Sequence, residues 1–159
     1  MPRKMLLLCL VALIALSFSK SPPRPGAEGI RVEGPRAFRR NIERALRLIE
    51  EFSPDQFRDV VAAVRFIRLT RSRPGPFVIA YCDRDRRIYI VSEYYAERIT
   101  QSRVYPFAFY SLPALIVHEA THLQQMLGGR ATGSREAELE AIQAERLLRS
   151  LLSGSVTLH

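Results

Sequence analysis

The stretch Leu112 to Gly129, LPALIVHEATHLQQMLGG, carries His118, Glu119 and His122 in the order H-E-x-x-H. Residues four apart lie on the same face of a helix, so the two imidazoles can bind a single metal ion. Glu119 then lies beside them, where its carboxylate can reach a water molecule on that metal. The stretch therefore predicts a metal-binding helix, and the other elements are expected to pack around it.

Local sequence signals agree with a helix at this position. Ser111 is a suitable N-cap, Pro113 is favoured in a first turn, and the pair Gly128 and Gly129 is typical of a helix end. The turn before the motif is strongly apolar, which predicts a helix buried in the middle of the domain. Burial of two histidines and a glutamate is costly unless these side chains have partners.

A single histidine on an apolar helix is more often a packed core residue than a metal ligand. This chain has only three histidines, however, and two of them have ligand spacing around a glutamate. We therefore predict that His118 and His122 bind Zn²⁺ and that Glu119 is a general base.

A third zinc ligand is expected on the following helix, because catalytic zinc needs three protein ligands and an open position for water. Ser134 can cap a helix over residues 135–152, and three glutamates stand near its start. At about 100° per residue, Glu138 and Glu140 flank the apolar stripe of this helix, whereas Glu136 lies further round. The helix dipole stabilises acidic residues in a first turn, so at least two of the three are expected to be solvated.

Two motifs together resemble a known family. HEATHLQQ followed by EAELEAIQAE is similar to the small gluzincin-type zinc metallopeptidases, in which H-E-x-x-H is followed by a glutamate on the next helix, often within E-x-E-A. The resemblance covers Leu112 to Leu152 and implies a minimal zincin-like fold with an antiparallel sheet before the active helix. It implies His118 and His122 as metal ligands and Glu119 as the general base. The third ligand would be Glu138, the first glutamate of E-x-E-A.

Two features differ from the family pattern. The acid that often follows the third ligand by four residues and braces a histidine is replaced by Ile142. Glu136 and Glu140 do have that spacing, so Glu136 stays an alternative third ligand. No tyrosine is identified as the group that stabilises the oxyanion, and His159 is terminal.

The segment Met1 to Ser19 has the pattern of a secretory signal peptide. Arg3 and Lys4 precede an apolar run over residues 5–16, and small residues follow at the positions that a signal peptidase requires. The run is shorter than the ~20 apolar residues of a spanning helix, so cleavage after Ser19 is favoured over an uncleaved signal-anchor. We expect a secreted, periplasmic or cell-envelope protein.

Size and charge limit the classes of function. With 159 residues the chain can form one domain with a real core, but not a second fold. The net charge is +8, spread along the chain mainly as arginine and without a nucleic-acid-binding motif. We expect no nucleic acid partner and a basic surface that favours a membrane surface or acidic substrates. Cys82 alone remains after cleavage, so no intramolecular disulfide is expected, and its thiol is predicted to be buried packing.

The predicted fold class is α+β, with a zincin-like domain over residues 37–153. Residues 20–36 are rich in Pro and Gly and are interpreted as a flexible spacer. Apolar residues at spacings of three and four predict two N-terminal helices, the second opening at Pro54.

A hairpin is predicted between these helices and the metal helix. The runs 77–82 and 87–91 are rich in branched and aromatic residues and flank a charged turn, which is typical of an antiparallel pair. Residues 92–110 are expected to form a short helix and a loop.

These observations predict a zinc-dependent metallopeptidase that acts on a peptide or protein substrate. A substrate peptide would add as a strand to the sheet edge. The alternative is a catalytically weak or inactive zincin-like module that binds metal and another envelope component. Glu119 separates the two hypotheses, because a binding module gains nothing from a general base at that position.

Overall fold

The computed structural model describes residues 29–154, and the segment predicted as a signal peptide therefore lies outside the described residues. The elements in chain order are β1 (Arg31–Glu33), α2 (Arg36–Phe52), α3 (Pro54–Ala63), β2 (Phe66–Thr70), β3 (Ala80–Asp83), β4 (Arg87–Val91), α4 (Ser92–Ser102), the 3-10 helix η1 (Pro106–Tyr110), α5 (Ser111–Leu127) and α6 (Arg135–Gly154). The predicted α+β class is confirmed. Within residues 29–154, no helix is both long enough and apolar enough to span a membrane.

The sheet is mixed, with the strand order β1-β2-β4-β3. The predicted hairpin is present as the antiparallel pair β3–β4, in which Tyr81 lies opposite Tyr89, but its first strand begins at Ala80 and not at Phe77. The two other pairs, β1–β2 and β2–β4, are parallel, so the expectation of an antiparallel sheet is wrong outside the β3–β4 pair. Helices α2 and α3 cross over between β1 and β2, so β2 returns in the same direction as β1. Strand β3 lies at one edge of the sheet.

Strand β1 corrects the interpretation of residues 20–36 as a flexible spacer. Arg31–Glu33 pairs in register with β2, and the backbone N–H of Arg31 donates to the carbonyl of Arg65 at 2.8 Å. The flanking side chains of Ile30 and Val32 pack against the core. Apolar contacts at these two positions therefore hold the last part of this segment against the sheet.

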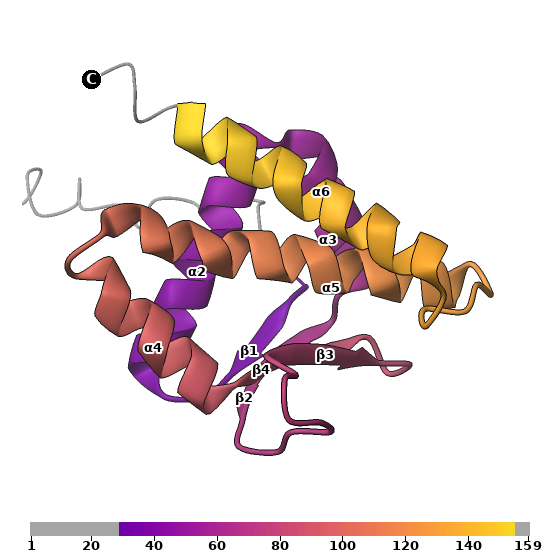
Figure 1. The fold of residues 1–159 in the computed structure, drawn as a ribbon, viewed down its shortest axis with the longest axis horizontal. Coiled ribbons are helices and arrows are strands. Elements are labelled where there is room, and N and C mark those ends of the chain that lie inside the picture. The colour runs from indigo at the N-terminus through magenta and orange to yellow at the C-terminus, as the bar shows by residue number, and fades with distance from the viewer. Residues whose placement is uncertain (1–28, 155–159) are drawn as a thin grey trace, which may run out of the picture.

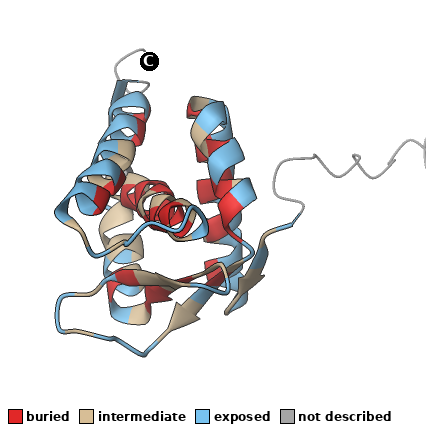
Figure 2. Ribbon diagram, turned by 90° about the vertical axis from the view of Figure 1, so that its right-hand side faces the viewer, coloured by how far each residue is buried: buried red, intermediate tan, exposed pale blue. Residues whose placement is uncertain are grey.

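Helix α5 is the central element of the domain. It contacts β3 and β4 on one side and α6 on the other, and in Figure 1 it lies between the sheet and α6. Figure 2 shows the buried residues gathered on the facing sides of the helices and sheet. The apolar turn before the H-E-x-x-H motif is buried, as predicted. Ser111 is the first residue of the helix and not its cap, because η1 continues directly into α5.

The two N-terminal helices, α2 and α3, pack against α5. The predicted apolar stripe of α2 is buried and comprises Phe38, Ile42, Ala45, Leu46 and Ile49. Helix α3 opens at Pro54, as predicted, and packs on α5. This core holds the apolar side of α5, and the polar side of α5 faces β3 and α6.

Candidate metal centre

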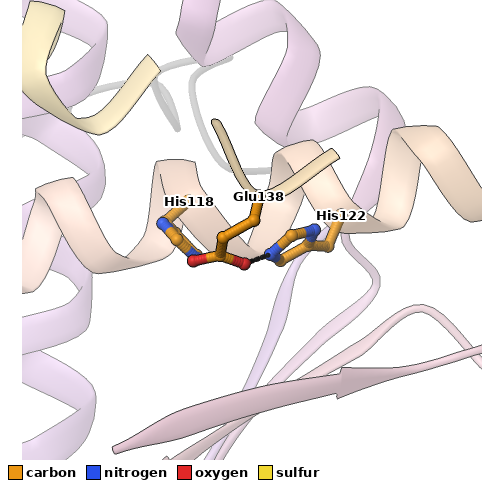
Figure 3. A group of neighbouring side chains, drawn as sticks. All are labelled: His118, His122 and Glu138. Atoms are coloured by element: carbon orange, nitrogen blue, oxygen red, sulfur yellow. Dashed lines mark ion pairs between the residues drawn. The ribbon is translucent and has the colours of Figure 1, made fainter. Parts of the chain in front are cut away.

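Three side chains from α5 and α6 meet at one point. Nε2 of His118 lies 3.7 Å from Oε1 of Glu138, and Nε2 of His122 lies 3.2 Å from Oε2 of the same carboxylate. One ligand atom from each residue lies within 4.8 Å of the others, a spacing that could hold a metal ion (Figure 3). The structure thus brings together the three residues predicted as ligands from the sequence.

The turn between α5 and α6 explains how Glu138 reaches the histidines. Gly129 has a φ of 74°, the left-handed conformation that commonly follows a helix end. The backbone N–H of Arg130 then bonds to the carbonyl of Gln125 at 2.8 Å. The hydroxyl of Ser134 accepts the N–H of Ala137 at 3.1 Å, which confirms the predicted cap. The chain therefore reverses, and the first turn of α6 faces the second half of α5.

The two alternative glutamates lie elsewhere. Oε2 of Glu140 accepts a hydrogen bond from Arg130 at 2.7 Å and another from Gln125 at 3.2 Å. These bonds, with that of Arg130 the stronger, hold the pKa of Glu140 below its usual range. Glu136 is exposed on α6. Neither residue belongs to the cluster formed by His118, His122 and Glu138.

Glu145 is a partner of the site that sequence reasoning missed. Its Oε2 lies 3.2 Å from Nδ1 of His118, and its other oxygen is held by Arg149 at 2.8 Å. The contact with His118, followed by that with Arg149, lowers the pKa of Glu145 although burial opposes the shift. Burial also opposes the charged form of His118, but Glu145, Glu119 and Glu138 together raise its pKa. A carboxylate from α6 therefore lies beside His118, although the sequence has Ile142 at the position where the family pattern places such an acid.

Gln125 is a second missed partner. Its Oε1 lies 2.9 Å from Nδ1 of His122, and its amide nitrogen donates to the carbonyl of Ala137 at 2.9 Å. The spacing of three residues between His122 and Gln125 on one helix is the sequence signal that could have identified this contact. Each imidazole thus has a partner for Nδ1, and both Nε2 atoms point toward Glu138.

Glu119 is buried beside the cluster and contacts Cys82 from β3. The Glu119 carboxylate and the Cys82 thiol interact, and each affects the pKa of the other. Burial raises the pKa of Glu119, whereas His118 and His122 act in the opposite direction. Burial, and then Glu119, raise the pKa of the Cys82 thiol. Cys82 was predicted to be buried packing, and it does pack against the core, but it is only partly buried and also lines the cleft.

A cleft of about 470 Å³ lies over these residues. It is bounded by β3 and the loop before it, by α5, and by the start of α6. Its apolar lining includes Phe77, Val78, Ile79, Leu115 and Met126. The cleft therefore combines an apolar wall with a polar floor, which is typical of ligand-binding sites.

No family model, curated protein or solved structure matches this chain. The resemblance to gluzincins therefore has the support of its motifs and of the local geometry alone.

The partners of the imidazoles indicate that a cation fits between them. Each ring faces an oxygen acceptor at both nitrogens, Glu138 at Nε2 and either Gln125 or Glu145 at Nδ1. A neutral imidazole has one N–H, so it satisfies only one acceptor unless it becomes protonated. A divalent cation beside both Nε2 atoms would satisfy the two rings and the carboxylate together. Two imidazole nitrogens and one carboxylate are a donor set that suits zinc.

Proposed function

We propose that this protein is a zinc-dependent peptidase of the gluzincin type. The observation that carries the proposal is the convergence of His118 and His122 from α5 with Glu138 from α6. Glu119 is buried on α5 beside the two histidines. Two histidines and one glutamate form a three-ligand set that leaves a coordination position open, as catalytic zinc requires. Burial of a carboxylate destabilises the folded state, and Glu119 is buried. This cost favours a chemical role for Glu119.

Each residue has a separate part in the proposed reaction. His118, His122 and Glu138 hold the zinc, while Glu145 and Gln125 orient the two rings. Bound zinc would activate a water molecule and polarise the scissile carbonyl. The Glu119 carboxylate accepts a proton from the water and delivers it to the leaving amine.

An extended peptide is the proposed substrate. Strand β3 is an edge of the described sheet and borders the cleft, so its outer backbone groups are available to a peptide strand. Beside it, Phe77 is 93% exposed and Ile79 is 42% exposed. Large apolar side chains exposed at the rim of a cleft favour a substrate with apolar residues.

The test uses the purified full chain. We expect about one zinc per chain, as a three-ligand site requires. We also expect the protein to cleave peptides in a random mixture, with the products identified by mass spectrometry. His118→Ala and His122→Ala should lose both the zinc and the cleavage. Stoichiometric zinc with no cleavage of any peptide would favour the alternative of an inactive metal-binding module. Zinc content unchanged in both histidine variants would refute the metal centre itself.

A further inference from the structure

The side chain of Gln125 is buried, at 2% exposure, in the contact between α5 and α6. Its oxygen faces Nδ1 of His122 at 2.9 Å. Its nitrogen donates to the carbonyl of Ala137 at 2.9 Å and to Oε2 of Glu140 at 3.2 Å. Glutamine is usually an exposed residue, and here both ends of the amide are used by the protein.

The network fixes which end of the amide faces His122. The carbonyl of Ala137 can only accept a hydrogen bond, and the Glu140 carboxylate, paired with Arg130 at 2.7 Å, also acts as an acceptor. The amide NH₂ must therefore point to these two groups. A flipped amide would place its oxygen against two other acceptors, so Gln125 presents its oxygen to His122.

This orientation of the amide determines which nitrogen of the His122 ring carries the proton. Oε1 of Gln125 can only accept, so Nδ1 of His122 must carry the proton. Nε2 is then left with a lone pair that points toward Glu138, the direction from which a metal would bind. The same amide holds the carbonyl of Ala137, the residue before Glu138. Gln125 thus connects a proposed ligand on α5 with a proposed ligand on α6.

We infer that Gln125 is a positioning residue for the metal: it fixes His122 in the form with the proton on Nδ1 and holds α6 so that Glu138 faces the same point. The inference rests on the proposed metal-binding role of His122. The protein would then hold its two rings differently, one through the carboxylate of Glu145 and the other through a neutral amide.

Two substitutions separate this role from a purely structural one. Gln125→Met has a similar volume but offers only a weak thioether acceptor, and it should weaken zinc binding by about 10–100-fold. Gln125→Glu loses the bond to Ala137 and lies near Glu140, so the metal-free protein should become less stable. Its carboxylate still accepts the Nδ1 proton, however, so zinc affinity should fall less than in Gln125→Met even though the bond to Ala137 is lost.

The measurements are chelator competition for zinc affinity, thermal unfolding of the metal-free chain, and ¹⁵N NMR of the histidines in the zinc-loaded chain. The Nδ1 proton of His122 should be observed in the wild type and in Gln125→Glu, and it should exchange rapidly in Gln125→Met. Gln124→Met is the matched control, because Gln124 lines a different pocket, and it should leave the zinc affinity unchanged.

The outcomes distinguish this inference from the proposed function. Wild-type affinity in Gln125→Met, or equal weakening in both Gln125 variants in proportion to their stability, would overturn the positioning role alone. A wild-type chain without stoichiometric zinc would overturn the proposed function and this inference together.

Discussion

Oε2 of Glu145 lies 3.2 Å from Nδ1 of His118, and Glu145 follows Glu138 by two turns of α6 on the same face of the helix. One helix therefore supplies both a carboxylate for the proposed metal and a carboxylate behind one of its ligands. A carboxylate beside Nδ1 orients an imidazole and increases the basicity of its other nitrogen. The Glu145 side chain is itself held by Arg149, so its position is defined on both sides.

Glu145→Ala should reduce zinc affinity by about 10–100-fold without removing a ligand. The variant leaves Nδ1 of His118 without its acceptor, so the ring gains rotational freedom. Chelator competition with the purified chain measures the change. Glu136→Ala, an exposed glutamate on the same helix, is the control and should bind zinc as the wild type does. Equal affinity in the two variants would contradict the bracing role.

Glu138→Ala should lose stoichiometric zinc, because two histidines are too few ligands for tight binding. Zinc content after dialysis against a weak chelator is the measurement. Glu136→Ala and Glu140→Ala should retain the metal, since neither residue is in the cluster. If zinc survives Glu138→Ala and is lost from Glu136→Ala, the third ligand is Glu136.

The sequence predicted the parts of the site that depend on local spacing. His118 and His122 share a face because they are four residues apart on one helix, and the helix is recognisable from its apolar turn. The helical angle favoured Glu138 and Glu140 over Glu136, and the resemblance to the E-x-E-A motif then selected Glu138. None of these features depends on how α5 and α6 pack against each other.

The residues that were missed depend on long-range packing. Glu145 contacts His118 because α5 and α6 lie antiparallel at one particular offset, which no local pattern states. Gln125 is on the same helix as His122, but its amide is also held by the carbonyl of Ala137 on α6. Cys82 reaches Glu119 because β3 passes over α5. Strand β1 was missed because its three residues stand in a segment rich in Pro and Gly, and only pairing with β2 makes them a strand.

Cys82 should react slowly with iodoacetamide at mildly alkaline pH. Its pKa is raised by burial and then by the charge of Glu119, and only the thiolate is reactive. Glu119→Gln removes that charge, lowers the thiol pKa and should accelerate alkylation. Peptide mapping by mass spectrometry distinguishes Cys82 from Cys9. Both proteins should react at the same rate in urea, and identical rates in the folded proteins would contradict the contact between Cys82 and Glu119.

The exported protein should begin at or near Lys20. The prediction rests on the basic residues Arg3 and Lys4, the apolar run behind them and the small residues up to Ser19. N-terminal sequencing of protein recovered from the medium or envelope tests it. An intact Met1 on most of the soluble cellular protein would contradict both cleavage and export.

Glu119→Gln should keep the zinc and lose the proposed peptidase activity. The substitution preserves the size of the side chain and its place beside His118 and His122, but an amide cannot accept the proton of the attacking water. A positioned general base typically contributes 10²–10⁴-fold, roughly 3–5 kcal/mol of barrier, so the loss should appear in kcat. Zinc analysis and peptide cleavage on the same preparation provide the measurement.

The informative comparison is with Glu138→Ala, because the two variants should lose different properties. Loss of zinc in Glu138→Ala abolishes binding and activity together, whereas Glu119→Gln should show full zinc content with little turnover. Equal cleavage by Glu119→Gln and the wild type would exclude Glu119 as the base even if the metal centre is correct. Loss of zinc from Glu119→Gln would instead mean that this buried carboxylate supports the metal and is not a proton acceptor.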